Sequence, residues 1–102
     1  MTEAKLRSLN GKEVRSLYHR ELHPTFPPDE LKPLRTIQRH MEEGSYSAWG
    51  LFQGEVLLGY ALLWQMLGSG TFLLDYLGVP QAQRGQGWGS QLIAQLLQQL
   101  QG

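Results

Sequence analysis

A glycine-rich segment near the end of the chain most constrains what this sequence can fold into. Residues 84–90 read RGQGWGS, so three of the seven are glycine. A residue without a Cβ lets the backbone turn sharply and lets a ligand approach the main chain closely. Residues 71–79 before it (TFLLDYLGV) are mostly apolar, which is typical of a buried strand, and Pro80 ends that run.

After the glycines, apolar residues recur at the spacing of a helix that buries one face. They are Trp88, Leu92, Ile93, Leu96, Leu97 and Leu100. The chain therefore predicts a strand, a glycine-rich turn and a helix in direct succession. The first turn of a helix has unpaired N–H groups and the positive end of the helix dipole, so this order of elements favours binding of a diphosphate.

The spacing of the glycines distinguishes between three kinds of phosphate loop. The dinucleotide pattern G-x-G-x-x-G fails in both registers, because its last glycine falls on Ser90 or on Leu92. The Walker pattern fails because the sequence has no Gly-Lys-Ser/Thr. The pattern R-x-x-G-x-G fits, with Arg84, Gly87 and Gly89 at its fixed positions.

In this pattern, and in the phrase LDYLGVPQAQRGQGWGSQLIAQLL around it, the chain resembles the GNAT superfamily of acyl-CoA-dependent N-acetyltransferases. The resemblance is specific over residues 71–100 and diffuse before them. It implies an α+β protein with the acyl-CoA N-acyltransferase fold, a mixed, mostly antiparallel sheet flanked by helices, as one domain over residues 1–102. Family members continue past this helix, so the resemblance also implies a fold that is incomplete at the C-terminus. Either the chain is truncated or a partner chain supplies the rest.

The resemblance further implies that acetyl-CoA is the co-substrate and that no metal takes part. In the family, backbone N–H groups of the central strand polarise the thioester carbonyl, which places Leu77, Gly78 and Val79 beside the acetyl group. Gly78 has a second interpretation as a β-bulge. The residues expected to bind the pyrophosphate are Arg84, Gly85, Gln86, Gly87, Trp88, Gly89 and Ser90.

Arg84 and Trp88 each leave two possibilities open. The Arg84 guanidinium reaches a phosphate, or it faces solvent while only the backbone of the loop binds the ligand. Trp88 is larger than the residue that the family usually has at this position. It packs under the helix or it contacts the adenine.

Asp75 is the candidate catalytic base, because it is the only acidic residue after Glu55 and lies in an otherwise apolar strand. A carboxylate there is unfavourable unless it is solvated or paired. Facing the cleft, it would relay a proton from the acceptor amine through water. Alternatively, it is a buried cap or an ion-pair partner for the N-terminal helices. Tyr76 is expected on the opposite face of the strand, in the core.

Amide formation from a thioester needs a neutral amine, a polarised carbonyl and a protonated leaving thiol. We therefore expect an acyltransferase that moves an acetyl group from acetyl-CoA to a primary amine by direct attack. Phe26 and Glu30 lie in a segment that closes over the acceptor in the family, so they contact substrate or pack as a lid. The alternative function is a non-catalytic CoA-binding or interaction module.

Composition argues against several other classes of protein. The formal net charge is zero, which does not favour nucleic acid or an anionic membrane as a partner. The absence of cysteine excludes disulfides, thiolate zinc sites and a cysteine nucleophile. His19 and His23 are four residues apart, but Arg20 stands where a zinc-protease helix carries Glu, so no metal is expected. No apolar run is long enough to span a bilayer and the N-terminus does not resemble a signal peptide, so we expect a cytoplasmic protein.

The N-terminal half is expected to begin with a strand over residues 5–9. Asn10 and Glu13 then form a capping box for a helix that runs to about residue 22. Residues 23–28 are expected to be a loop because three of them are proline. A second helix is predicted over residues 29–43, ended by Gly44.

Two strands, over residues 46–53 and 56–66, follow with Gly54 and Glu55 between them as a hairpin, and residues 67–70 form the next turn. The strand over residues 71–79 is then left at an open edge of the sheet. Such an edge exposes unpaired backbone groups, so a homodimer or an aggregate that pairs through this edge is expected.

Overall fold

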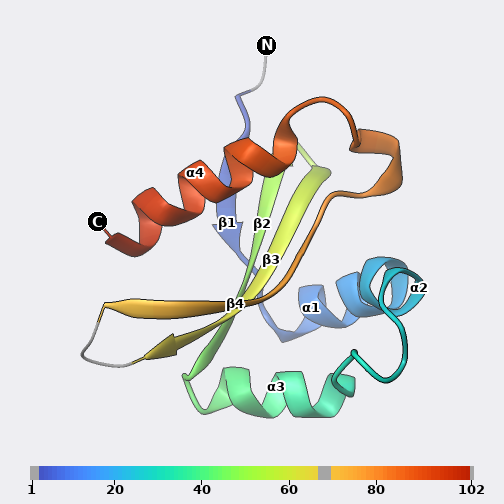
Figure 1. Cartoon of the computed structure of the whole chain (residues 1–102), viewed down its shortest axis with the longest axis vertical. Coiled ribbons are helices and arrows are strands. Elements are labelled where there is room, and N and C mark those ends of the chain that lie inside the picture. Colours follow the sequence, from blue (N-terminus) through green and yellow to red (C-terminus); the bar gives the residue numbers. More distant parts are fainter. Residues whose placement is uncertain (1–2, 67–69, 102) are drawn as a thin grey trace.

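A four-stranded antiparallel sheet organises the computed structural model, which describes residues 3–66 and 70–101. The strands lie side by side in sequence order: β1 (Lys5–Ser8), β2 (Tyr46–Gln53), β3 (Val56–Met66) and β4 (Thr71–Gly78). Helix α4 (Trp88–Gln101) crosses one face of the sheet, and α1 (Gly11–Leu17) and α3 (Leu34–Glu42) pack on the other face (Figure 1). The predicted α+β architecture is confirmed, and all strand pairs in the described chain are antiparallel.

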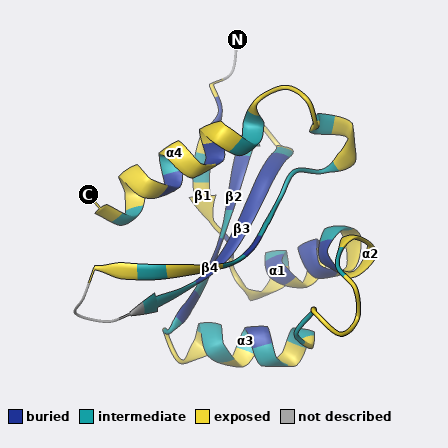
Figure 2. Ribbon diagram, in the orientation of Figure 1, coloured by how far each residue is buried: buried dark blue, intermediate teal, exposed yellow. Residues whose placement is uncertain are grey.

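Two separate apolar cores form because side chains alternate between the faces of the strands. On one face, Tyr60 and Leu62 of β3 pack with Val14 of α1 and Ile37 of α3. On the other face, Ala61 and Leu63 of the same strand pack with residues of α4. The central strand β3 therefore holds both helical layers, and it is buried along most of its length (Figure 2).

The first helix begins where the sequence predicts. The Asn10 side chain accepts a hydrogen bond from the Glu13 N–H at 2.9 Å, and the Glu13 carboxylate accepts one from the Asn10 N–H at 3.0 Å. This capping box satisfies two N–H groups that the first turn leaves without partners. The hydrogen bond to Asn10, with Arg7 beside it, lowers the pKa of Glu13 below its ordinary value.

The segment after α1 differs from the prediction in two places. The helix continues through a π-helical turn, η1 (Tyr18–Leu22), into the short α2 (His23–Thr25), so His23 to Thr25 are not loop. Pro24 directly follows the π-helical turn, in the first turn of the element α2. The second predicted helix begins only at Leu34, since Pro33 disfavours the helical conformation for the residue before it.

The strands of the hairpin and the last helix match their predicted ranges closely. β2 and β3 have the predicted bounds, β4 ends one residue early at Gly78, and α4 begins at Trp88 as predicted. Most of the predicted turn over residues 67–70 lies outside the described residues.

A β-bulge interrupts the pairing of β3 with β4. Leu62 pairs with Tyr76 and Leu63 pairs with Leu74, which leaves Asp75 as an extra residue in β4. Asp75 and Tyr76 consequently point to the same face of the sheet, where both contact Lys32. Tyr76 is in the core as predicted, but its predicted orientation opposite to Asp75 was wrong, because simple alternation does not hold across a bulge.

Gly78 is not a bulge, because it pairs in register with Tyr60 of β3. The absence of a side chain there has a packing reason. A Cβ at this position would lie 2.3 Å from the Tyr60 hydroxyl oxygen and 2.4 Å from the ring carbon that bears it. The buried Tyr60 side chain thus occupies the space that a Cβ at position 78 would need.

The outer edge of the sheet is apolar. β4 pairs only with β3 within the described chain, which agrees with the predicted open edge. Leu73 and Leu74 on β4 are 59% and 42% exposed, and Ile93 and Leu97 on α4 are also exposed. Figure 2 shows exposed residues along β4 and along the outer side of α4.

We predict that Gly78→Ala lowers the free energy of unfolding by about 1–3 kcal/mol, because the added methyl group displaces the Tyr60 ring from a filled core. The control is Gly11→Ala, since a Cβ at Gly11 meets no atom within 4 Å. Urea denaturation of both variants measures the difference. Equal stability of Gly78→Ala and the parent would show that the Tyr60 contact does not require the glycine.

Candidate functional site

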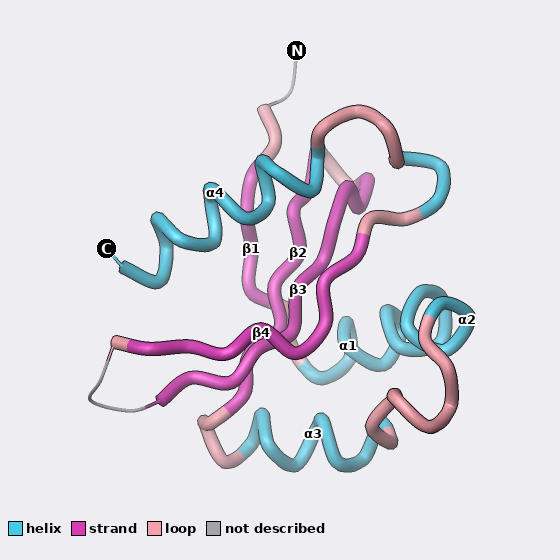
Figure 3. The backbone as a smooth tube through the Cα atoms, viewed as in Figure 1, coloured by secondary structure: helices cyan, strands magenta, loops and turns pink. Residues whose placement is uncertain are grey.

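The junction between β4 and α4 contains two glycines in a conformation that other residues rarely adopt. Figure 3 shows β4 leading through the short turn η2 (Gln81–Gln83) and a loop directly into α4. Gly85 has φ = 80° and Gly87 has φ = 85°, both in the left-handed region. A Cβ at either position would meet no atom within 4 Å, so the backbone faces open space there.

The first turn of α4, next to these glycines, has N–H groups that are not bonded within the helix. The Gly87 carbonyl accepts a hydrogen bond from the Gln91 N–H at 3.2 Å, which makes it the first acceptor of the helix. The N–H groups of Trp88, Gly89 and Ser90 therefore precede the first intrahelical donor. Together with the positive end of the helix dipole, they suit an anionic ligand.

Arg84 braces the turn before the glycines. Its Nε donates a hydrogen bond to the Val79 carbonyl oxygen at 2.9 Å, and the side chain is exposed. This hydrogen bond joins the two ends of the turn formed by residues 79–84. Neither interpretation of Arg84 from the sequence included this role.

Trp88 packs against the core under α4, the same core to which Leu77 of β4 contributes. Its indole Nε1 is buried and has no hydrogen-bond partner among the described residues. A Cβ added at the next residue, Gly89, would lie 3.7 Å from the Val79 side chain, which is an ordinary packing distance. The Trp88 ring therefore anchors the first turn of α4 to the core. The backbone at Gly89 is not crowded by its neighbours.

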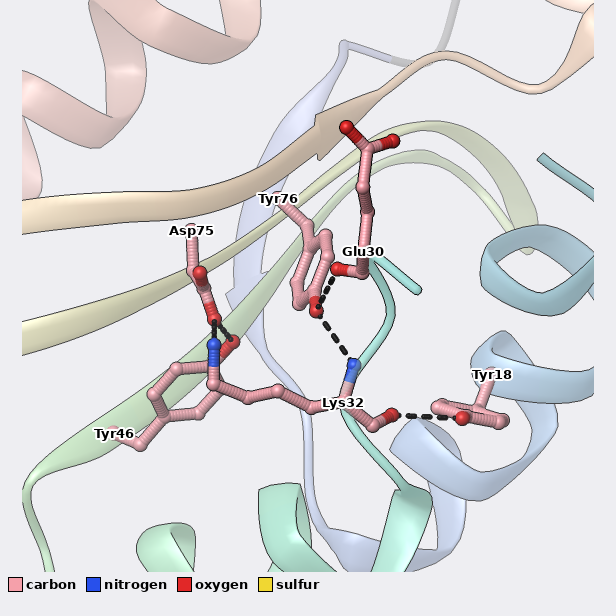
Figure 4. A network of polar contacts seen from close by, with 6 residues as sticks. All are labelled: Tyr18, Glu30, Lys32, Tyr46, Asp75 and Tyr76. Carbon is pink, nitrogen blue, oxygen red and sulfur yellow. Dashed lines mark hydrogen bonds and ion pairs between the residues drawn. The ribbon is translucent and has the colours of Figure 1, made fainter. Parts of the chain in front are cut away.

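A polar cluster lies on the other side of β4, at the bulge (Figure 4). The Asp75 Oδ2 accepts hydrogen bonds from the Lys32 Nζ at 2.8 Å and from the Tyr46 hydroxyl at 2.7 Å. Burial, and then the nearby Asp75 carboxylate, raise the pKa of Tyr46 far above its ordinary value. Tyr46 is therefore a constant hydrogen-bond donor to Asp75.

The backbone of Lys32 is fixed by two further tyrosines. The Tyr76 hydroxyl accepts from the Lys32 N–H at 2.9 Å and donates to the Glu30 carbonyl oxygen at 3.1 Å. The Tyr18 hydroxyl donates to the Lys32 carbonyl oxygen at 2.7 Å. The segment between α2 and α3 is thereby attached to β4 and to the first helix.

The structural alternative for Asp75 was an ion pair with the N-terminal helices. Asp75 does form an ion pair, but its partner Lys32 lies in the segment between α2 and α3 and not in a helix. Sequence reasoning missed Lys32, Tyr46 and Tyr18. The only signal for them was the requirement that a carboxylate within an apolar strand has a partner.

The predicted acceptor residues lie beside this cluster. The Phe26 ring contacts the Tyr76 ring edge-on, with centroids 5.1 Å apart. Glu30 contributes its backbone carbonyl, while its carboxylate points away from Asp75 (Figure 4). Strand β4 thus connects both parts of the candidate site, with Asp75 and Tyr76 at the bulge and Leu77, Gly78 and Val79 leading to the glycine loop.

A groove of about 720 Å³ lies elsewhere, between the first helix, the β2–β3 hairpin and the turn after β4. Arg20, Phe52 and Gln81 are among the residues that line it. The described lining residues include none of those predicted to bind the co-substrate or the acceptor. Within residues 3–66 and 70–101, no cluster of three or more His, Cys, Asp or Glu residues could hold a metal, and no helix is long and apolar enough to cross a membrane.

The sequence profile of the acetyltransferase (GNAT) family matches residues 12–102 of this chain. The chain belongs to this family. The match covers both the glycine loop and the polar cluster at the bulge. Among curated proteins, no sequence matches the chain significantly.

Solved GNAT structures share the fold. A protein from Bacteroides thetaiotaomicron assigned to the GNAT family superposes with a TM-score of 0.74 at 18% identity, over 92% of this chain and 54% of its own. The ribosomal-protein-S18-alanine N-acetyltransferase of Escherichia coli gives a TM-score of 0.73 at 22% identity, over 96% and 59%. An aminoglycoside acetyltransferase from an uncultured soil sample, in complex with sisomicin, gives 0.64 at 13% identity, over 95% and 69%. The chain therefore spans little more than half the length of the first two structures.

We predict that Tyr76→Phe speeds amide hydrogen exchange at Lys32, because the Lys32 N–H loses its acceptor. A lost hydrogen bond of about 1–1.5 kcal/mol corresponds to roughly tenfold faster exchange. Tyr18→Phe is the matched control, since it removes the bond to the Lys32 carbonyl and leaves the N–H bonded. Unchanged exchange at Lys32 in Tyr76→Phe would contradict this attachment of the segment.

Proposed function

We propose that this GNAT chain binds acetyl-CoA at the β4–α4 junction and transfers its acetyl group to a primary amine by direct attack. The observation that carries the proposal is the pair of left-handed glycines, Gly85 and Gly87, facing open space at the start of a helix of 14 residues. A diphosphate needs several N–H donors and no obstructing side chain, and both the open space at these glycines and the first turn of α4 support this loop as its site.

The residues present fit the parts of acetyl-CoA in order along the chain. The pyrophosphate would accept hydrogen bonds from the N–H groups of residues 85–90. The thioester would lie beside Leu77, Gly78 and Val79, whose strand is paired on one side only and so offers backbone groups at its free edge. Such donors stabilise the charge that develops on the carbonyl oxygen.

The transfer is balanced without a further reactant. The neutral amine forms a bond to the acetyl carbon, the carbon–sulfur bond breaks, and the proton lost by nitrogen balances the one gained by the thiolate. If the amine arrives as ammonium, its extra proton passes through water to Asp75. Asp75 is two residues from Leu77 in β4. Its carboxylate accepts hydrogen bonds from Lys32 and Tyr46, so the relay requires the Lys32 ammonium to move away first.

The acceptor side of the site would be formed by the segment between α2 and α3, including Phe26 and Glu30. The names of two structural neighbours support an amine as acceptor, since one acts on an alanine of a ribosomal protein and the other is an aminoglycoside acetyltransferase. We assign the chain to the cytoplasm as part of the same proposal.

We predict that Gly87→Val weakens CoA binding at least about tenfold, because a left-handed backbone there becomes strained and a side chain enters the open space. Gly44→Val is a matched control, since Gly44 has a similar φ of 82° and equally open surroundings far from the loop. Calorimetry with CoA measures both, and Gln91→Ala on the exposed face of α4 should bind like the parent. Equal CoA affinity of Gly87→Val and Gly44→Val would contradict the assignment of the loop. Binding of CoA without any turnover on amines would favour a non-catalytic CoA-binding module.

We also propose that copies of this chain associate through β4. Leu74→Lys places a charge on the apolar edge and should shift the chain toward monomer, as edge lysines do in natural sheets. Val56→Lys is the control, because Val56 is comparably exposed at 50% but lies at the β2–β3 hairpin. Sedimentation velocity over a range of concentrations measures the change. A parent chain that stays monomeric throughout would rule out the association.

A further inference from the structure

The ammonium group of Lys32 lies in a small site with the composition of a cation-binding pocket. Its Nζ is 2.8 Å from the Asp75 Oδ2. It is also 5.6 Å from the centre of the Tyr76 ring and 5.8 Å from the centre of the Trp64 ring. Both distances are within the range over which an aromatic face attracts a cation. A carboxylate and two aromatic rings therefore surround one positive charge.

The walls of this site are held by contacts that do not involve the Lys32 side chain. Tyr46 donates to the Asp75 carboxylate at 2.7 Å and is itself almost fully buried. The Trp64 ring packs against Tyr46 with centroids 4.8 Å apart and against His40 at 4.6 Å. The bulge in β4 directs Asp75 to this face. The site is thus formed by the sheet and its core, and Lys32 comes to it from a connecting segment.

The Lys32 side chain can leave without a rearrangement of the backbone. Two tyrosine hydroxyls hold the Lys32 main chain, so rotation of the side chain alone removes the ammonium from the site. The ion pair is partly open to solvent, with 31% of the Lys32 side chain and 19% of the Asp75 side chain exposed. Ion pairs with such access to water are weak, so a cation from solution can compete with Lys32.

We propose that Asp75, Trp64, Tyr76 and Tyr46 form a binding site for an alkylammonium group, and that Lys32 occupies it as an internal competitor. The ligand class is a primary amine in its charged form on a flexible aliphatic chain, which is the chemistry that Lys32 itself presents. That this ligand is the acceptor of acetyl transfer rests on the proposed function, whereas the site itself does not. An acceptor would displace the Lys32 ammonium and so release Asp75.

The experiment uses Lys32→Met, which keeps the aliphatic length of the side chain and removes its charge. The probe is n-butylammonium, which copies the lysine side chain, and n-butanol is the uncharged control. NMR spectra follow the Trp64 indole N–H and the backbone N–H groups of Asp75 and Tyr76 during each titration, with CoA absent. Ionic strength is held constant with sodium chloride, because the site is partly exposed.

We expect Lys32→Met to bind n-butylammonium saturably and at least about tenfold more tightly than the parent, since the internal competitor is gone. The double variant Lys32→Met with Asp75→Asn should show no saturable shift, and n-butanol should give none with either. Lys32→Gln is measured in parallel and replaces Lys32→Met if the melting temperature shows that Met disturbs the fold. Equal affinity of parent and Lys32 variants, or binding that survives Asp75→Asn, would overturn the proposal.

The two proposals fail separately in this design. A saturable ammonium site in a chain that never acetylates an amine would leave the cation site intact and contradict the proposed transfer. If the chain acetylates amines but its Lys32 variants do not bind n-butylammonium, the proposed transfer stands and the cation site is contradicted.

Discussion

β4 contains one residue more than β3 can pair with, and that residue is Asp75. The bulge turns Asp75 and Tyr76 to the same face of the sheet, where they hold the segment between α2 and α3 through Lys32. A bulge also bends its strand. Beyond it, the strand continues to Gly78, where the missing Cβ makes room for the Tyr60 ring, and then to the glycine loop. A single strand thus positions both the segment proposed to bind the acceptor and the glycine loop proposed to bind the pyrophosphate.

The packing of α4 on the sheet depends on a glycine in the central strand β3. Gly59 of β3 lets α4 approach closely, since a Cβ there would lie 3.2 Å from the Leu92 side chain. Leu92 is fully buried against this strand, and Trp88 packs one turn earlier. The position of the first turn of α4, and hence the direction of its N–H groups, follows from this contact with the sheet.

Most element ranges could be predicted because they depend on local signals. The Asn10 capping box, the turn at Gly54 and Glu55, and the apolar spacing of α4 each act within a few residues. The glycine loop was predicted for the same reason, although the bracing role of Arg84 was not. The orientation of Tyr76 was wrong because it depends on a bulge that only strand register reveals. The start of the second helix was wrong for a local reason, since Pro33 delays it to Leu34. The partners of Asp75, Lys32 and Tyr46, come from segments 43 and 29 residues away in sequence, so no spacing rule connects them.

If acyl-CoA binds at the β4–α4 junction as proposed, an NMR titration of the isotopically labelled chain with CoA should locate it there. The largest shifts should occur at the backbone N–H groups of residues 85–90, with smaller ones at 77–79, because the proposed pyrophosphate contacts lie in the loop. The backbone N–H signals of Arg20 and Phe52, which line the separate groove, should not shift. Shifts confined to that groove, with the glycine loop unchanged at saturation, would contradict the account.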